Sequence, residues 1–251
     1  MNVETCAALL AINRRFYEQF AADFARTRRS RPAGFERILP HLRPAANVAD
    51  LGCGNGRLLG FLAERGWRGR YLGVDSSAEL LAIAAANAPR DPAIRSDFRR
   101  GELVTLDPAT PLPLAGELGR EEWDAVAVLA VLHHIPGRMH RLRLVAACAG
   151  LLRPGGVLVV STWQFLAAAR LRARILPWEA AGIQPEAVEP GDYLLAWGAG
   201  AAGQRYCAAI DEHALEELAA TAGLTPEITF RADGHEGTLN LYGIFRKPPN
   251  P

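Results

Sequence analysis

A loop rich in glycine follows a short apolar run near residue 50. Gly52, Gly54 and Gly56 are spaced G-x-G-x-G in this loop, and glycine lets a bare backbone approach a ligand closely. Asp75 ends the next predicted strand, where a carboxylate can accept hydrogen bonds from both hydroxyls of a ribose, as in dinucleotide folds. The two features together predict a site for a cofactor that carries a nucleoside.

The spacing and charge of the loop discriminate between cofactors. Nicotinamide and flavin enzymes use G-x-G-x-x-G, whose third glycine allows close helix packing, and Arg57 occupies that position here. Asp50 puts a carboxylate just before the loop, which disfavours a pyrophosphate but suits the cationic amino-acid end of S-adenosylmethionine. We therefore predict S-adenosylmethionine as the cofactor, and a purely structural glycine turn is the alternative.

The loop joins the two strands of a predicted β-α-β unit. A mainly apolar strand covers residues 47–51, a helix begins at Arg57, and a second strand covers residues 70–75. Upstream, a helix is predicted over residues 33–42, before Pro44. A longer amphipathic helix is predicted over residues 5–29. Its apolar and aromatic stripe consists of Leu9, Ile12, Phe16, Phe20 and Phe24.

Strands and helices continue to alternate along the chain. The further predicted elements are a helix over residues 78–88, strands over 97–102 and 123–132, a helix over 138–152, a turn over 153–156 and a strand over 157–161. This alternation predicts an α/β fold with a mostly parallel sheet covered on both faces. Two final strands, over residues 226–231 and 239–246, are separated by a short loop. They are expected to pair antiparallel and close one edge of the sheet.

The segment over residues 162–203 interrupts the alternation. It is rich in alanine, glycine and proline and has no clear period, so we interpret it as a lid or a substrate-facing insertion. Its aromatic side chains can line an apolar pocket for a small ring or stack a flipped base. They are Trp163, Trp178, Tyr193 and Trp197.

Composition sets wider limits. The 251 residues, 49% of them hydrophobic, predict one domain over residues 1–251. A net charge of +1 is too weak to imply nucleic acid or an anionic membrane by bulk electrostatics. The four cysteines lack the spacing of a zinc or disulfide framework, so no metal is predicted. The sequence has no basic leader with a cleavage site and no apolar run of about 18 residues, so a soluble, cytoplasmic protein without a membrane partner is expected.

The glycine loop, Asp75 and the terminal hairpin together resemble class I methyltransferases, and the resemblance covers residues 16–246. It implies a Rossmann-like, mostly parallel seven-stranded sheet with a C-terminal antiparallel hairpin. It also implies that the end of the third strand gives the adenine an acidic residue and an apolar neighbour, here Glu102 and Leu103, with Asp97 as the competing acid. The cofactor site that we predict comprises Tyr17, Asp50, Gly52, Gly54, Gly56, Asp75, Ser76, Glu102, Leu103 and Leu129.

Finer similarities point to the tRNA wobble-uridine carboxymethyl methyltransferases, including the methyltransferase domain fused to an AlkB-like oxygenase in animals. Residues 16–28 resemble their N-terminal lid helix, in keeping with lid helices over about residues 5–42, and residues 130–134 resemble the motif after their central strand. A late series of motifs is also similar, although Cys207 and Ala208 replace a Tyr and a His. The series consists of Leu176-Pro177-Trp178, Gln204-Arg205-Tyr206-Cys207 and Glu216-Glu217-Leu218.

This resemblance implies a carboxylate as the nucleophile, which is ionised at neutral pH because a carboxyl group has a pKa of about 4. The enzyme then needs to pin the carboxylate rather than remove a proton. Arg205 is the predicted pin, because a guanidinium fork matches a carboxylate, although an ordinary surface arginine is an equal alternative. Tyr206 and His134 complete the predicted catalytic set. His134 is interpreted either as a base or as a structural hydrogen-bonding group, and Tyr17 either as a lid over the cofactor or as plain packing.

Partners and rival functions stay open at this level. Residues 1–43 hold eight arginines against four acids, which suits RNA phosphates or a solvated helix face equally. The methyl acceptor is therefore a tRNA or a small molecule, and the resemblance to eukaryotic members implies a small activator subunit as a further partner. The rival functions are a small-molecule methyltransferase of quinone or secondary metabolism and a non-catalytic, cofactor-binding scaffold.

Overall fold

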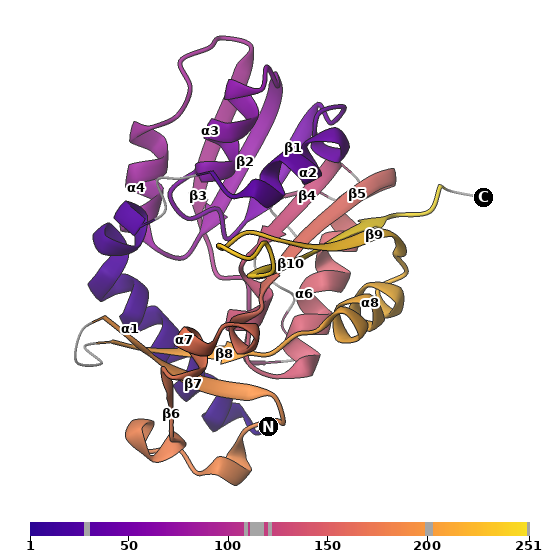
Figure 1. Cartoon of the computed structure of the whole chain (residues 1–251). Coiled ribbons are helices and arrows are strands. Elements are labelled where there is room, and N and C mark those ends of the chain that lie inside the picture. Colours follow the sequence, from indigo (N-terminus) through magenta and orange to yellow (C-terminus); the bar gives the residue numbers. More distant parts are fainter. Residues whose placement is uncertain (28–30, 108–109, 111–117, 120–121, 199–202, 250–251) are drawn as a thin grey trace.

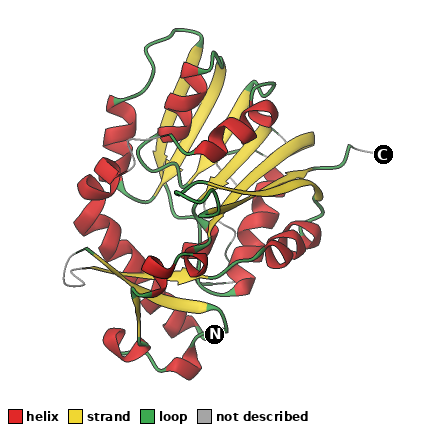
Figure 2. Ribbon diagram, in the orientation of Figure 1, coloured by secondary structure: helices red, strands yellow, loops and turns green. Residues whose placement is uncertain are grey.

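A seven-stranded sheet runs through the upper part of the molecule, and a small second sheet lies below it (Figures 1 and 2). The computed structural model describes residues 1–27, 31–107, 110, 118–119, 122–198 and 203–249. The strand order of the large sheet is β3-β2-β1-β4-β5-β10-β9. The order reverses between β1 and β4, which is the position where open α/β sheets bind their ligands.

The large sheet is parallel except for its C-terminal hairpin. The parallel strands are β1 (Asn47–Leu51), β2 (Gly69–Asp75), β3 (Ile94–Arg100), β4 (Trp123–Leu129) and β5 (Leu152–Trp163). The strands β9 (Thr225–Ala232) and β10 (Asn240–Arg246) pair with each other antiparallel, and β10 also pairs antiparallel with β5. The predicted mostly parallel sheet with a terminal hairpin is therefore confirmed.

Helices cover both faces of this sheet because successive strand residues point to opposite sides. On β1, Val48 packs in one apolar cluster and Ala49 packs in the other. The helices α2 (Ala33–Leu42) and α3 (Arg57–Glu64) contribute to the cluster of Val48. The helices α6 (Arg138–Leu151) and α8 (Glu212–Thr221) contribute to the cluster of Ala49. The remaining crossover helix is α4 (Ala78–Ala86).

Helix α1 (Val3–Thr27) runs beside both sheets, as the indigo ribbon shows (Figure 1). Leu9, Ile12 and Phe16 of its predicted apolar stripe are buried, and the helix kinks at Phe20. Residues 28 and 29 of the predicted helix lie outside the described residues, and so does the side chain of Phe24. Within the described part of the chain, no helix combines the length and the apolar character that are needed to cross a bilayer.

The insertion contains regular structure that its composition does not reveal. Its strands β6 (Ile175–Leu176) and β7 (Asp192–Trp197) form an antiparallel sheet with β8 (Gly203–Ala208), which begins at the last residue of the predicted insertion. Short helical turns precede and connect these strands. They are η2 (Phe165–Ala167), α7 (Ala169–Arg172), η3 (Trp178–Ala181) and η4 (Pro185–Ala187). Each piece is too short to show a period in the sequence, and its role as a lid stays a prediction.

The predicted bounds of three strands are wrong. Strand β3 begins at Ile94 and ends at Arg100, so Glu102 follows it rather than belonging to it. Strand β4 ends at Leu129 because Ala130, at φ 59°, turns the chain into the 3₁₀ turn η1 (Leu132–His134). Strand β5 begins at Leu152, and the predicted turn over residues 153–156 is a bulge within it. Buried Leu132 extends the apolar run past the true end of β4, so hydrophobicity alone misplaced that end.

Candidate active site

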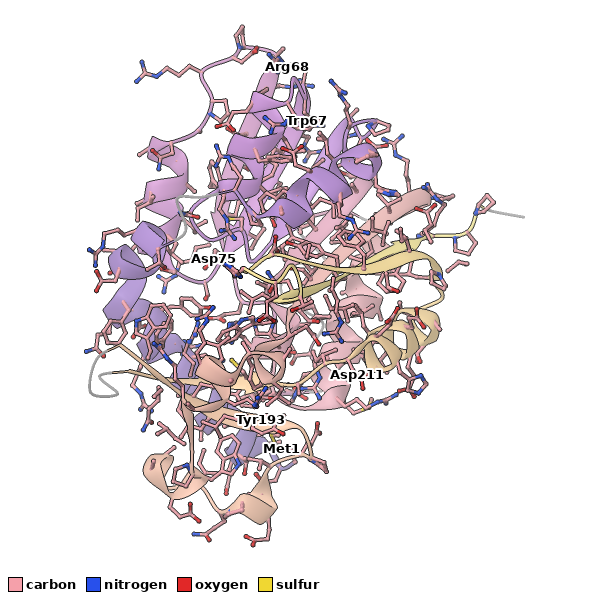
Figure 3. All side chains as sticks on the ribbon, in the orientation of Figure 1. Met1, Trp67, Arg68, Asp75, Tyr193 and Asp211 are labelled. Atoms are coloured by element: carbon pink, nitrogen blue, oxygen red, sulfur yellow. The ribbon has the colours of Figure 1, made fainter. Side chains whose placement is uncertain are left out.

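A cavity of about 640 Å³ lies where β1, β2 and β4 end, and we call it the loop cavity. Small-molecule sites typically measure about 300 to 1,000 Å³. Figure 3 shows Asp75 in the region between the large sheet and the small sheet that carries Tyr193. The structure brings together every predicted cofactor residue except Gly56 in the wall of this cavity. These residues are Tyr17, Asp50, Gly52, Gly54, Asp75, Ser76, Glu102, Leu103 and Leu129.

The glycines of the loop adopt backbone conformations that other residues avoid. Gly52, Gly54 and Gly56 have φ angles of +83°, +54° and +74°, in the left-handed region that glycine enters without penalty. A Cβ on Gly52 would lie 2.2 Å from Cγ2 of Val131, whereas a Cβ on Gly54 would have nothing within 4 Å. Gly54 therefore presents bare backbone to the cavity. Gly56 is the N-cap of α3, outside the cavity wall.

Asp75 is held by the loop itself. Its Oδ2 accepts a hydrogen bond of 2.8 Å from the backbone N–H of Gly54, and its Oδ1 accepts one of 2.9 Å from Ser77. Burial raises the pKa of Asp75, and these backbone N–H groups counter the rise. Each carboxylate oxygen can still accept a further hydrogen bond, so the group has the capacity that two ribose hydroxyls require.

Asp50 is a carboxylate buried beneath the loop. It is only 2% exposed, and its Oδ2 accepts a hydrogen bond of 2.5 Å from the hydroxyl of Tyr71. Burial raises the pKa of Asp50 to about 7, with the neighbouring charge of Asp75 adding to the rise. A positive group bound in the cavity would favour the ionised form, so Asp50 is suited to a cationic ligand.

The segment after β3 contributes an acid and an apolar residue. Glu102 and Leu103 both line the loop cavity, and Glu102 forms an exposed ion pair of 3.1 Å with Arg14 of helix α1. The competing acid, Asp97, is exposed, pairs with Arg99 at 2.8 Å and does not line the cavity. Glu102 is thus the better placed of the two predicted acids.

A second cavity of about 610 Å³ adjoins the first, and we call it the arginine cavity. The two cavities share four lining residues, namely Tyr17, Arg57, Ala130 and His134. Ala130 holds a positive φ of 59° at this junction, and such strained backbone is concentrated at functional sites. A ligand in one cavity would therefore lie next to a ligand in the other.

Arg205, on β8, lies in the wall of the arginine cavity and is only 4% exposed, so it is not the surface arginine of the alternative interpretation. Its Cζ is 4.9 Å from the ring centroid of Phe16, 5.0 Å from Trp163 and 4.7 Å from Trp197. Among the described residues, its buried Nε has no hydrogen-bond partner. Trp163 and Trp197 also line this cavity, whereas Trp178 and Tyr193 line neither.

The other two predicted catalytic residues differ in their placement. His134 lines both cavities, and its Nδ1 lies 3.0 Å from the backbone oxygen of Tyr206. A carbonyl oxygen can only accept, so Nδ1 carries the proton and Nε2 has the lone pair in the neutral ring. The side chain of Tyr206 is fully buried, donates to Asp192 at 2.7 Å and lines neither cavity. The structure therefore places Tyr206 behind His134 rather than at the cavity surface.

Sequence reasoning missed several cations of the site. Arg57 entered only as the residue that excludes a dinucleotide motif, yet it lines both cavities, and burial lowers its pKa. Arg31, Arg170 and Arg174 also line the arginine cavity. Arginine supplies nearly all the basic residues of this chain, so residue type alone could not single these four out. In the part of the chain that the structure describes, no group of three or more His, Cys, Asp or Glu is arranged to hold a metal ion.

Comparison with known families identifies the fold and the cofactor class. A family model described as a methyltransferase domain matches residues 21–227. The chain belongs to this methyltransferase family. Its fold is the class I fold of S-adenosylmethionine-dependent methyltransferases, and solved structures of such enzymes superpose on it. A SAM-dependent methyltransferase of Methanosarcina mazei superposes with a TM-score of 0.65 at 19% identity, covering 85% of this chain and 98% of the other.

A second solved structure covers almost the whole methyltransferase. It is the 1,6-didemethyltoxoflavin-N1-methyltransferase of Burkholderia thailandensis with bound 1,6-didemethyltoxoflavin and S-adenosylhomocysteine. It matches with a TM-score of 0.61 at 21% identity over 99% of this chain and 91% of the other. At this identity, the likeness shows the shared fold.

Curated relatives share part of the sequence. Trans-aconitate 2-methyltransferase of Streptomyces avermitilis is 38% identical over 46% of this chain. A tRNA (carboxymethyluridine(34)-5-O)-methyltransferase of Arabidopsis thaliana is 28% identical over 59% of it, and a ubiquinone biosynthesis O-methyltransferase of Xanthomonas campestris is 31% identical over 47%. The matches span 38%, 32% and 44% of these relatives' own lengths. This chain thus matches less than half of each relative.

The loop cavity has the chemical groups that S-adenosylmethionine requires. Leu103 and Leu129 offer apolar surface for adenine, Asp75 offers a ribose acceptor, and Asp50 offers a carboxylate for a cationic group. Gly54 leaves open space where any other residue would project a side chain. The residues present therefore fit the cofactor of the family.

Proposed function

We propose that this methyltransferase transfers a methyl group to a carboxylate of its acceptor and forms a methyl ester. The observation that carries the proposal is the environment of Arg205. A buried cation without a counter-ion is costly, and this one has a buried Nε without a hydrogen-bond partner among the described residues. It lines the cavity that adjoins the loop cavity. An anionic acceptor group would satisfy it.

The proposed mechanism is positioning rather than proton removal. Arg205 binds the acceptor carboxylate through its guanidinium fork, and the rings of Phe16, Trp163 and Trp197 hold that fork in place. Bound S-adenosylmethionine supplies an electrophilic methyl group. Held by Asp50 and Asp75 in the loop cavity, the cofactor would give its methyl group to a carboxylate oxygen, and the electron pair of the broken C–S bond would remain on sulfur. No proton moves, because the carboxylate is already ionised.

His134 and Tyr206 act as positioning residues in this proposal. The backbone oxygen of Tyr206 accepts from Nδ1 of His134, and Asn13 of helix α1 donates to the same oxygen at 3.2 Å. These bonds fix the imidazole at the junction of the two cavities. Tyr17 is the neighbouring lid residue, since its ring lies edge-on to His134 at 5.9 Å.

The acceptor that we favour is a carboxymethyluridine in tRNA. The similarity to the Arabidopsis thaliana enzyme, whose name contains this substrate, covers more of the chain than the other two matches do. Trp163 and Trp197 can stack a flipped base, and a small activator subunit is a further proposed partner. The second candidate is a small carboxylic acid, which the similarity to the trans-aconitate enzyme favours.

Labelled S-adenosylmethionine distinguishes these acceptors. Incubation with tRNA that carries carboxymethyluridine should yield the methyl ester, detected by nucleoside mass spectrometry. Label on trans-aconitate alone would favour the second candidate, and label only on phenols would point to quinone-type chemistry and contradict the carboxylate proposal. Cofactor binding without turnover on any of these acceptors would indicate a scaffold.

Substitution of Arg205 tests the assigned role. Arg205→Gln should lower kcat/KM for the carboxylate acceptor by roughly 10- to 100-fold, the loss expected for one charged hydrogen-bonding partner. Arg205→Lys should keep part of the activity, because an ammonium keeps the charge but lacks the fork. Unchanged binding of S-adenosylhomocysteine serves as the check that both variants fold. Full activity in Arg205→Gln would contradict the proposal.

A further inference from the structure

The arginine cavity carries more positive charge than one carboxylate can neutralise. Among the described residues, five arginines line it against a single acid, Asp233. The carboxylate of Asp233 already accepts hydrogen bonds from the backbone of Gly34 at 2.8 Å, from Asn240 at 2.7 Å and from Tyr242 at 2.6 Å. The lining arginines are Arg31, Arg57, Arg170, Arg174 and Arg205.

Two of these arginines form no ion pair with another described residue. Arg170 and Arg174 are exposed, and no ion pair among the described residues includes either of them. By contrast, Arg31 in the same wall is engaged by Glu64. The charges of Arg170 and Arg174 therefore face the cavity without a protein counter-ion among the described residues.

The segment that carries these two arginines is anchored to the strand of Arg205. Leu171 is 5% exposed and packs in the same apolar cluster as Leu195 of β7. Leu195 in turn pairs with Arg205 in the register of β7 and β8. The backbone oxygen of Arg174 accepts a hydrogen bond of 2.8 Å from Ala196. Arg170, Arg174 and Arg205 thus belong to one packed unit within a single cavity wall.

We propose that Arg170 and Arg174 form a second anion site, which binds another anionic group of the same acceptor whose carboxylate binds Arg205. This inference rests on the proposed function. Guanidinium groups bind carboxylates and phosphates alike, so the second group is either a phosphate of a nucleotide or a further carboxylate of a polycarboxylic acid. The shared requirement is an acceptor with at least two anionic groups, which a monoanionic acid or a neutral phenol does not meet.

Binding measurements test the site independently of methyl transfer. The double variant Arg170→Gln/Arg174→Gln is titrated with uridine 3′,5′-bisphosphate and with citrate, and the fluorescence of Trp163 and Trp197 in the cavity wall reports binding. Arg172→Gln is the matched control, because Arg172 shares the short helix α7 with Arg170, donates to the backbone of Leu166 at 2.5 Å and does not line the cavity. At least one of these two polyanions should bind the double variant tenfold more weakly or worse, whereas its affinity for the control variant should equal that for the native protein.

Kinetics then connect the site to the acceptor. Carboxymethyluridine and its 3′,5′-bisphosphate form one pair of substrates, and a monocarboxylic acid and trans-aconitate form the other. In the native protein, the polyanionic member of one pair should have the lower KM, and the double variant should lose that difference in KM. The pair affected identifies the source of the second anion.

The outcomes separate this inference from the proposed function. Absence of methylation with intact, Arg170- and Arg174-dependent binding would reject the proposed function alone. Polyanion affinities and substrate preferences that are equal in the double variant and the control would overturn the second anion site, whatever the activity.

Discussion

Asp50 is a single buried carboxyl group whose titration makes the stability of the folded protein depend on pH. In the folded protein, burial raises the pKa of Asp50 to about 7, whereas an unfolded aspartate has a pKa of about 3.9. The folded state therefore holds this proton more tightly than the unfolded state does. The contribution of Asp50 to the free energy of unfolding is therefore fully present below about pH 4, and it is lost as the pH rises through about 7.

The substitution Asp50→Asn removes this titration. Since a tenfold change in proton affinity is worth about 1.4 kcal/mol, the variant should gain up to about 4 kcal/mol of unfolding free energy over the native protein at pH 8, and little at pH 4. Urea denaturation at both pH values measures the difference, with Asp97→Asn as an exposed control. Equal pH dependence in Asp50→Asn and the native protein would show that Asp50 does not titrate in this range. The variant should also bind S-adenosylmethionine more weakly at pH 8, because it lacks the negative charge.

Asp75 combines two tasks in one carboxylate, since it holds the loop and offers oxygens to the cavity. Asp75→Ala should weaken S-adenosylhomocysteine binding by about 1 to 3 kcal/mol, because a buried polar partner is lost. The affinity of Asp75→Asn for S-adenosylhomocysteine should lie between those of the native protein and Asp75→Ala, because one oxygen remains as an acceptor. Isothermal titration calorimetry measures the affinities. Asp97→Ala, outside the cavity wall, should bind normally, and an unchanged affinity in Asp75→Ala would remove Asp75 from the site.

At the scale of elements, the turn from β1 into α3 depends on glycine for two separate reasons. Gly52 needs a positive φ, and its missing Cβ leaves room for Val131, which would otherwise lie 2.2 Å away. Gly66 has a similar φ of +79° but open space around its Cβ position. Gly66→Ala is therefore the matched control for the backbone penalty alone.

We expect Gly66→Ala to lose about 1 kcal/mol of stability. Gly52→Ala should lose the same 1 kcal/mol and roughly 1 to 3 kcal/mol of stability in addition, because the new methyl group overpacks the loop. Its affinity for S-adenosylhomocysteine should drop more than tenfold, whereas Gly66→Ala should bind normally. Urea denaturation and calorimetry measure both effects. If the two variants behave alike, the contact with Val131 is of no consequence.

The bounds of helices and strands show which parts of the fold the sequence can predict. The span Asn47–Leu51 and the helix Ala33–Leu42 match their predicted bounds because punctuation by glycine or proline coincides with a change of period. The end of β4 was misplaced because Leu132 is as buried as the strand before it. Contacts between distant segments leave no local pattern, so neither the aromatic surroundings of Arg205 nor the wall formed by Arg170 and Arg174 was predictable.

At the scale of the whole molecule, overall charge and local charge differ. The chain has a net charge of +1, yet in the part of the chain that the structure describes, five arginines and one acid line the arginine cavity. The described lining of the loop cavity, by contrast, has more acids than arginines: Asp50, Asp75, Glu102 and Asp107 against Arg14 and Arg57. Two adjoining cavities of opposite charge would favour a cationic cofactor in the loop cavity and an anionic acceptor in the arginine cavity.

This separation predicts different responses to salt. Raising the ionic strength from about 0.05 to about 0.3 M shortens the screening length from about 14 to about 6 Å, so the KM of a polyanionic acceptor should rise severalfold. The Kd of S-adenosylmethionine should change by less than about twofold, because Asp50 is buried and buried charges are screened less. Kinetics in potassium chloride measure the first quantity and calorimetry measures the second, with a neutral osmolyte as the control for nonspecific effects. Equal sensitivity of both ligands would indicate that bulk screening, rather than the arginine cavity, governs acceptor binding.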